Sequence, residues 1–386
     1  MVLRPGHRGE NRRRPPRSEA HHPSGNIGCG AWSMTELTTT WRDGVPPEID
    51  SVADAGPVSH RFLRAAWFGA AAQAYGKRVT TLLVGERDRP LLALPLAATG
   101  PHAAGIGMVV GSYWPLRTFV MVHGAEPPHI AAMLRAAFAK YRAIRVGPLP
   151  ADDWTIPALL RAASEVGCVS LRREVGCTWL LDLGEAHRGG GYPRPSTLKK
   201  NRYHERQLQS FGALEWRTIS GADWPGALPL LATIEENSWL ADETDGSDAK
   251  FTTQGHGRFW AECVRDPTLA EMLGAATLHV GGEPAAFSFD LRAGPTCHAI
   301  ANSYDRRFER HSPGKILYYR NLASLAEQGV ENVDWGVGDS GYKQTLGARR
   351  GPQMVDLLIV RPGLASLVAR LMAHARRSAW RVADRV

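Results

Sequence analysis

The chain has 386 residues, of which 44% are hydrophobic, and a formal net charge of +8. This length can bury a sizeable core and predicts two domain-sized units. The charge sits at the ends, because residues 1–33 carry six Arg and two Glu, residues 364–386 carry five Arg and one Asp, and the stretch between them is neutral. The neutral body argues against a nucleic-acid groove through it.

Residues 1–49 are predicted to be a basic tail. Residues 1–33 are rich in Arg, Pro, Gly and His, with too little apolar content to offset the entropy of ordering. They lack the apolar core of a secretory signal, and Met34 is a plausible true start. The chain has no run of 18 apolar residues, and its five Cys and scattered His show no metal-ligand spacing. We therefore expect a reduced, cytoplasmic protein without a metal.

A first unit is predicted for residues 50–185. Its apolar patterns and turn signals place a hairpin around the turn at 85–89. The expected helices are 59–75, 127–141 and 157–166, and the expected strands are 79–84, 90–97, 117–122, 143–146 and 178–183.

A Gly- and Pro-rich linker, residues 186–195, separates this unit from a second one at residues 196–362. The second unit opens with a basic helix that contains Lys199, Lys200, Arg202, His204 and Arg206. This charge run is either a solvated helix face or a wall that attracts an anionic substrate. Further helices are expected at 224–239 and 254–264, a hairpin at 275–280 and 285–291, and strands at 298–304 and 331–335.

The two units share one order of elements: helix, hairpin, third strand, helix, strand. This order indicates an internal duplication and an α/β (α+β) fold with mixed central sheets flanked by helices. The copies differ where the helix after the third strand begins. The first copy has a carboxylate there, Glu126, which would repel an anion.

In the second copy the same helix begins at Ser312-Pro313-Gly314 and ends at Gly329. The free N–H groups of the first turn and the positive end of the helix dipole suit a phosphate. The residues expected to hold an anionic cofactor are Arg310, His311, Ser312, Gly314 and Lys315. A well-capped helix without a ligand is the alternative for this stretch taken alone.

Four motifs in the second unit form an ordered set: Glu236-Asn-Ser-Trp239, a hairpin ending in Gly-Glu-Pro-Ala-Ala, Tyr304-Asp305 followed by Ser312-Pro-Gly314, and Asp334-Trp-Gly-Val-Gly338 leading to Tyr342-Lys343. With them, residues 57–347 resemble the acetyltransferase-like family associated with bacterial cellulose and exopolysaccharide synthesis. That family is built on the GNAT fold (GCN5-related N-acetyltransferases) and is related to the Fem peptidyltransferases.

The resemblance implies two tandem GNAT-like domains, a degenerate first one and a catalytic second one. It implies acyl transfer from acetyl-CoA or another acyl-CoA to an amine or hydroxyl of a sugar, polysaccharide precursor or envelope metabolite. The loop around residues 310–315 would hold the pyrophosphate, and the thioester would enter the gap between the strands of His298 and Val333. A backbone amide there could stabilise the oxyanion by about 3 kcal/mol.

If the resemblance holds, Lys343, Asp339 and Tyr342 are the candidate catalytic residues. Each has a plainer interpretation, as a surface lysine, a turn cap and a rim aromatic respectively. The candidate substrate-binding residues are Trp239, Tyr304 and Trp335, which could equally be core or rim aromatics. Of Glu235 and Glu236, one may face the cleft, although helix-surface carboxylates are commoner.

Residues 363–386 are predicted to form a basic amphipathic helix with one apolar face: Leu364, Leu367, Val368, Leu371 and Met372. Docking of this face onto the body is one interpretation. The other is peripheral contact with an anionic inner membrane or a glycan-synthesis complex. Two other functions stay open: a Fem-like transferase that uses aminoacyl-tRNA, and a non-catalytic accessory protein of a glycan-synthesis complex.

Overall fold

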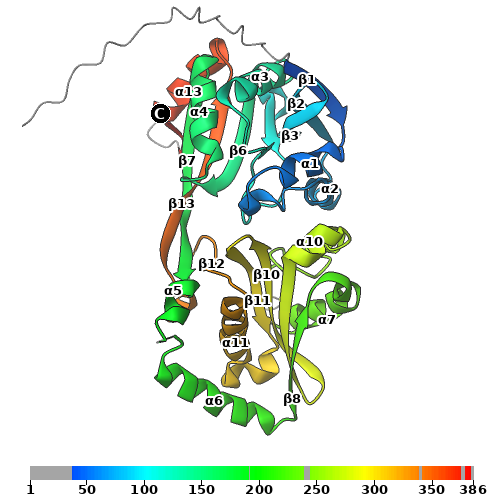
Figure 1. The fold of residues 1–386 in the computed structure, drawn as a ribbon, viewed down its shortest axis with the longest axis vertical. Helices are drawn as coiled ribbons and strands as arrows, with labels where there is room; N and C mark the ends of the chain where they lie inside the picture. Colours follow the sequence, from blue (N-terminus) through cyan, green and yellow to red (C-terminus); the bar gives the residue numbers. More distant parts are fainter. Residues whose placement is uncertain (1–36, 191, 239–243, 339–340, 375–378, 384–386) are drawn as a thin grey trace, which may run out of the picture. The chain divides into compact units, whose positions relative to one another are not determined.

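A computed structural model of the chain describes residues 37–190, 192–238, 244–338, 341–374 and 379–383 (Figure 1). Asp339, Trp239 and residues 1–36 lie outside these ranges, so the predictions made for them remain predictions. The prediction that residues 1–49 form a tail is wrong for its last part, which starts at residue 37. Residues 37–43 form a strand that pairs in register with residues 80–86, and a helix begins at Glu48.

The first half contains β1 (Leu37–Asp43), α1 (Glu48–Asp54), α2 (Ala65–Ala74), β2 (Val79–Glu86), β3 (Arg89–Thr99), β4 (Ile106–Val109), β5 (Val120–Met121), α3 (Pro127–Ala137), β6 (Ala143–Pro150), α4 (Thr155–Glu165) and β7 (Val169–Asp182). The predicted hairpin and the helices after it are confirmed.

The second half contains α5 (Leu183–Arg188), α6 (Pro195–Gln209), β8 (Leu214–Ile219), α7 (Trp224–Glu236), α9 (Gly257–Cys263), α10 (Pro267–Met272), β9 (Leu273–Val280), β10 (Glu283–Ala293), β11 (Thr296–Tyr304), α11 (Pro313–Glu327), β12 (Asn332–Asp334), α12 (Tyr342–Thr345), β13 (Arg349–Val360), α13 (Leu364–His374) and β14 (Arg381–Val382). The helix α5 extends into the predicted linker, and β14 lies within the predicted C-terminal helix.

The described strands form one mixed sheet of 14 strands, in the order β1-β2-β3-β4-β6-β13-β7-β12-β11-β10-β9-β8, with β5 and β14 off this path. The order of elements repeats. In the first half, β4 pairs parallel to β6 across the crossover helix α3, and in the second half β11 pairs parallel to β12 across α11. The predicted fold class, a mixed α/β fold flanked by helices, is confirmed.

The third strand of the first copy was predicted at 117–122, and this position is wrong. The strand equivalent to β11 is β4, in the glycine-rich stretch before it, and only Val120–Met121 of the predicted segment is a strand. Gly107 explains why the pattern was hidden. A Cβ at this position would lie about 3.0 Å from the ring of Tyr141, so close packing selects glycine over a typical strand residue.

The last strand of each copy crosses to the other half. The C-terminal end of β7 pairs with β12 through Leu180–Asp182, whereas β13 pairs with β6 through Met354–Val360. The two crossing strands also pair with each other along most of their lengths and run side by side in Figure 1. The division into units at residue 185 remains a prediction, and the sheet is continuous across it.

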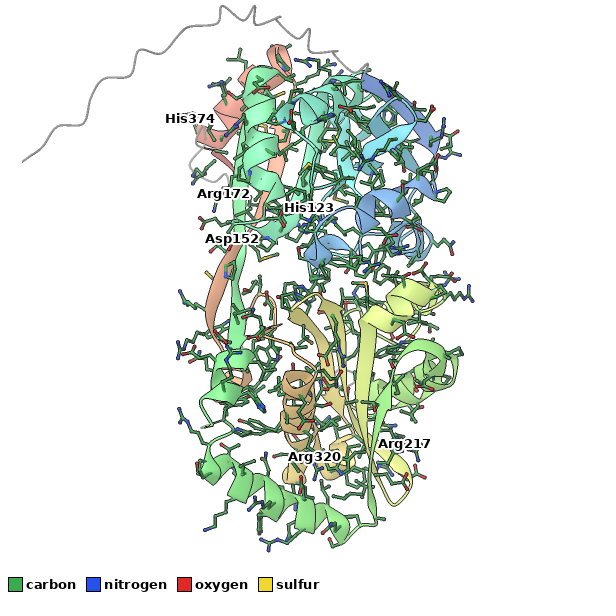
Figure 2. The ribbon with its side chains drawn as sticks, in the orientation of Figure 1. His123, Asp152, Arg172, Arg217, Arg320 and His374 are labelled. Atoms are coloured by element: carbon green, nitrogen blue, oxygen red, sulfur yellow. The ribbon has the colours of Figure 1, made fainter. Side chains whose placement is uncertain are left out.

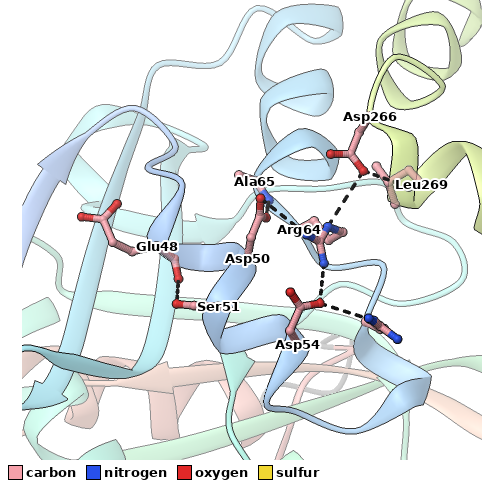
Figure 3. A network of polar contacts seen from close by, with 9 residues as sticks. Glu48, Asp50, Ser51, Asp54, Arg64, Ala65, Asp266 and Leu269 are labelled. Atoms are coloured by element: carbon pink, nitrogen blue, oxygen red, sulfur yellow. Dashed lines mark hydrogen bonds and ion pairs between the residues drawn. The ribbon is translucent and has the colours of Figure 1, made fainter.

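Side chains also join the two halves (Figure 3). Arg64 Nη1 lies 2.6 Å from Asp54 Oδ1, and Arg64 Nε lies 3.9 Å from Asp266 Oδ1 at the start of α10. Nearby, the buried ring of Trp67 contacts Phe259 edge to face, with ring centroids 4.9 Å apart. The second half thus buries its helices against the first half's core.

One buried carboxylate in the second half makes stability depend on pH. Asp290 on β10 is fully surrounded, and this burial raises its pKa to about 6 despite hydrogen bonds from Asn321 and Ser288. The folded state therefore holds a proton that the unfolded state releases near pH 3.8. The stabilisation that the protonated Asp290 carboxyl provides is fully present below pH 3.8 and is lost as the pH rises through about 6. We expect Asp290→Asn to raise the free energy of unfolding by about 2 to 3 kcal/mol above pH 6.

Urea titrations of both proteins at pH 4 and pH 7.5 would test this prediction. The gain should appear at the higher pH and shrink at the lower one. An equal effect at both values would show that the proton linkage assigned to Asp290 is wrong.

Candidate active site

The candidate site lies where β11 and β12 separate. Their parallel pairing ends at His298 and Asp334, where β12 ends, while β11 continues to Tyr304. The pairing of β11 with β10 shifts register at Ile300, which is the signature of a β-bulge. Backbone groups of β11 beyond His298 are thereby released from pairing with β12. This is the gap that the sequence placed between the strands of His298 and Val333.

Successive side chains of a β-strand point to opposite faces of the sheet, so neighbouring residues of β11 and of β12 lie on different faces. Cys297 and Val333 pack in a core cluster with Tyr318 and Leu322 of α11. Their neighbours His298 and Asp334, which are directly opposite each other in register, therefore point to the other face of the sheet. An imidazole and a carboxylate thus sit together at the point where the strands separate.

The environment sets the charge of both groups. Burial raises the pKa of Asp334 to about 6, while the Gly336 N–H at 2.9 Å, Thr178 and the charge of Lys343 act in the opposite direction. Burial, and then the nearby His60, lower the pKa of His298 to about 4. At neutral pH Asp334 is an ionised base and His298 is uncharged. The sequence motif contained Asp334, but only the pairing with His298 marks it as a site residue.

The first half contributes to the same face. The ring of Trp114 contacts His298 edge to face, with centroids 5.6 Å apart. Gly336, at φ +69°, packs against that ring, since a Cβ would lie 3.3 Å from it. His60 Nε2 lies 3.0 Å from Asp153 Oδ2. His60, Trp114 and Asp153 were not expected from the sequence, because they come from the copy considered degenerate.

A second feature is the start of α11. Ser312 occupies the N-cap position in the left-handed conformation, at φ 51°, without a side-chain capping hydrogen bond, and Pro313 follows it. Gly314, which was expected to help hold the cofactor, packs inside the protein. Gly314 is buried, and a Cβ would lie 2.9 Å from Asn302 Oδ1 and 3.1 Å from the Tyr304 ring. It allows the helix to pack closely on β11.

Cationic side chains gather beside this helix start. Burial and then the charge of Lys200 lower the pKa of Lys315. Burial is also the main cause that lowers the pKa of His204, and the charges of Lys200, His311 and Lys315 lower it further. Neither ring nitrogen of His204 has a hydrogen-bond partner among the described residues. We call Lys200, His204, His311 and Lys315 the cationic cluster. The lowered pKa leaves His204 uncharged at neutral pH, so its ring can donate one hydrogen bond. The repulsion between the charges of Lys200 and Lys315 would be relieved by a bound anion.

Arg320 joins α11 to α6 through a polar contact and to β8 through an aromatic one. Arg320 of α11, labelled in Figure 2, donates from Nε to Glu205 Oε1 at 3.1 Å. Its guanidinium also lies 4.1 Å from the centre of the Trp216 ring. The basic helix therefore has two faces. Lys200, which is itself exposed, and the half-buried His204 are one turn apart and belong to the cluster. Lys199, Arg202 and Arg206 are exposed on another side of the helix, at three-and-four spacing.

The first copy lacks such a cluster at the equivalent helix. His129 Nδ1 accepts a hydrogen bond from the N–H of Glu126 at 3.0 Å, and its Nε2 lies 3.0 Å from Glu86 Oε1. Carboxylates thus stand at the start of α3, where the second copy has cations. The difference between the two helix starts that the sequence indicated is present in the structure.

Lys343 is not a surface lysine. Its side chain is buried, and Nζ donates to the carbonyl oxygens of Trp335 at 2.8 Å, Gly336 at 3.2 Å and Gly338 at 2.5 Å. These contacts hold the loop that follows Asp334. The catalytic role assigned from the resemblance stays a prediction, and the geometry favours a positioning role.

We expect Lys343→Met to destabilise the protein by about 3 kcal/mol, because hydrogen bonds to a charged donor are lost and buried carbonyls are left unpaired. A thermal melt should show a Tm several degrees lower. An unchanged Tm combined with lost activity would instead assign Lys343 to the chemistry.

The remaining predicted site residues are exposed, half-buried or buried. Tyr342 is 45% exposed and stays available to a substrate. Trp335 is buried in the core cluster of α11, with its ring 5.7 Å from that of Tyr318, so its ring does not face solvent. Tyr304 is half-buried beside Gly314, and Arg310 is exposed. Glu235, considered a surface or cleft residue, is buried and accepts hydrogen bonds from the N–H groups of Lys250 and Phe251 at 2.8 and 2.7 Å.

Residues 195–344 match the family described as "Acetyltransferase (GNAT) domain". Three solved structures share the fold over most of the chain. FemX has a TM-score of 0.57 at 12% identity, covering 86% of this chain and 99% of that one. L-PGS from Bacillus licheniformis has a TM-score of 0.52 at 12% identity, covering 85% and 95%.

The third is the C-terminal domain of a putative lysylphosphatidylglycerol synthetase from Agrobacterium fabrum, with a TM-score of 0.50 at 14% identity, covering 84% of this chain and 94% of that one. No curated protein matches the sequence. Within the described ranges there is no cluster of His, Cys, Asp and Glu suited to a metal ion. The described helices are likewise too short or too polar to cross a membrane.

Proposed function

We propose that the protein transfers an acyl group from an acyl-CoA, acetyl-CoA in the simplest case, to an amine or hydroxyl acceptor. The observation that carries the proposal is the cationic cluster at the start of α11, directly after the strand that separates from β12. A phosphate-bearing donor bound at the cluster can extend along β11 and place its thioester beside Asp334. The GNAT-domain match to residues 195–344 supports the same reaction class.

In this mechanism Asp334 takes a proton from the acceptor's nitrogen or oxygen as that atom attacks the thioester carbon. Backbone N–H groups of β11 near the bulge at Ile300 stabilise the oxyanion. The new C–N or C–O bond forms, the C–S bond breaks, and the CoA thiolate takes up a proton. Tyr342, at the exposed rim, is the proposed donor of that proton.

The acceptor belongs to the face shared with the first half. Trp114 offers an aromatic surface, which suits a polar ring such as a sugar. The His60–Asp153 pair is buried and already bonded to Ser59 and Thr155, so it supports this face without contacting the acceptor. An acceptor among sugars, polysaccharide precursors or envelope metabolites is our proposal. It rests on this aromatic surface together with the resemblance stated above.

A second function is favoured by one observation. The exposed cations of α6, Lys199, Arg202 and Arg206, continue the cationic cluster outward and would suit the phosphates of a tRNA. In that case the donor is an aminoacyl-tRNA, as in Fem-like transfer. The same gap between β11 and β12 would then receive an aminoacyl ester in place of a thioester.

The two functions are separated by an assay of both donors. The full chain is incubated with acetyl-CoA and a pool of amino sugars and sugar nucleotides, and the release of CoA thiol is followed. In parallel it is incubated with charged tRNA, and deacylation is followed. Thiol release that depends on the acceptor supports the proposal. Deacylation of tRNA without thiol release would replace it with the second function.

A further inference from the structure

The C-terminal helix α13 packs against the sheet through small residues, while its large apolar residues face away. Ala369 and Ala373 are buried against Val169, Leu171 and Val360. The large apolar side chains are exposed: Leu364 by 78%, Leu367 by 55%, Val368 by 48%, Leu371 by 67% and Met372 by 62%. This is the reverse of an ordinary surface helix, in which the large apolar face is buried. The prediction that this face docks onto the body is therefore wrong.

Two shallow hollows flank the exposed face, and both have cationic edges. One, of about 460 Å³, is lined by Ile106, Leu358 and Met372 together with Arg142 and Arg361. The other, of about 530 Å³, is lined by Phe138 and Leu364 together with Arg135 and Arg361. No acidic side chain lines either hollow. The helix ends at His374, labelled in Figure 2.

We propose that the α13 face binds the surface of an anionic membrane, with the five apolar side chains inserted among the lipids and the arginines at the headgroups. Charge complementarity selects this occupant. A second copy would bring the same arginines together, and the tail of residues 1–33, which carries six Arg and two Glu, would also be repelled. An anionic lipid surface satisfies both the apolar face and its cationic edges. The inference does not depend on the proposed acyl transfer.

Vesicle flotation of the full chain tests the proposal. We expect binding to vesicles of phosphatidylcholine mixed with phosphatidylglycerol, at least about tenfold weaker binding to phosphatidylcholine alone, and release by added salt. Leu371→Asp should abolish binding. Val175→Asp, which makes the same change at an exposed apolar residue of β7, should leave it intact.

Two outcomes would overturn the proposal. One is absence of binding to the anionic vesicles, or equal binding by Leu371→Asp and the parent. The other is a dimer in sedimentation velocity that Leu371→Asp dissociates, because that result would assign the face to a second copy of the chain.

Discussion

Replacement of Asp334 by Asn is expected to lower kcat by roughly 10²- to 10⁴-fold, the usual contribution of a positioned general base. Asn keeps the shape of the side chain and can still accept the Gly336 N–H, so the fold should be retained. Because the base must be ionised, kcat/KM of the parent should rise with pH through about 6, the value to which burial raises the pKa of Asp334. The variant should lack this rise.

The matched control is Asp290→Asn, which changes another buried carboxylate of the second half whose pKa is also raised to about 6. It pairs with Ala299 of β11, but its side chain lies on the opposite face of the sheet, where Asn321 of α11 donates a hydrogen bond to it. The variant should therefore leave kcat unchanged. Steady-state kinetics from pH 5 to 8.5, each with a thermal melt, gives the comparison. An Asp334→Asn enzyme with parental kcat and the same pH profile would remove Asp334 from the mechanism.

The second large effect is expected at the cationic cluster. The double variant Lys200→Glu/Lys315→Glu should weaken acetyl-CoA binding by at least about 100-fold, since charge-assisted hydrogen bonds to phosphate contribute about 1.5 to 3 kcal/mol each. The effect should appear in KM far more than in kcat, because the cluster lies at the helix start and not at the reacting carbonyl. It should shrink as salt is added.

The control for this variant is Lys199→Glu/Arg202→Glu, which makes the same charge change on the exposed side of α6. Acetyl-CoA binding should be nearly unaffected. If these two residues prove essential and the cluster does not, the outer face of α6 is the functional one and a tRNA donor becomes the better account.

Local patterns were sufficient for much of the fold. Hairpins with alternating apolar residues, the helix that starts at Ser312-Pro313 and the glycine that ends it were all predictable, because each depends on neighbours in sequence. The strand β4 was missed because Gly107 is selected by contact with Tyr141, which no local pattern reveals. The exchange of β7 and β13 between halves was also missed, since it depends on pairing between residues more than 150 positions apart.

The candidate site shows the same difference between features that depend on local sequence and features that depend on long-range pairing. The helix start at Ser312-Pro313, where we propose that an anion binds, could be inferred from the sequence, because caps and charges are local features. The meeting of Asp334 with His298 and Trp114 could not, since it needs parallel pairing and contact with the other copy. Lys343 shows how the structure adds a second interpretation to a sequence prediction. Its position after a glycine-rich turn suggested chemistry, whereas its ammonium group binds the carbonyls of that turn.

Isothermal titration of the full chain with CoA and acetyl-CoA tests the central claim most directly, and Lys200→Glu/Lys315→Glu serves as the comparison. The account predicts one site per chain for both ligands and a loss of affinity of at least about 100-fold in the double variant. Absence of heat and of any thermal shift with either ligand, in a protein that unfolds cooperatively, would contradict the claim that α11 begins at a CoA site.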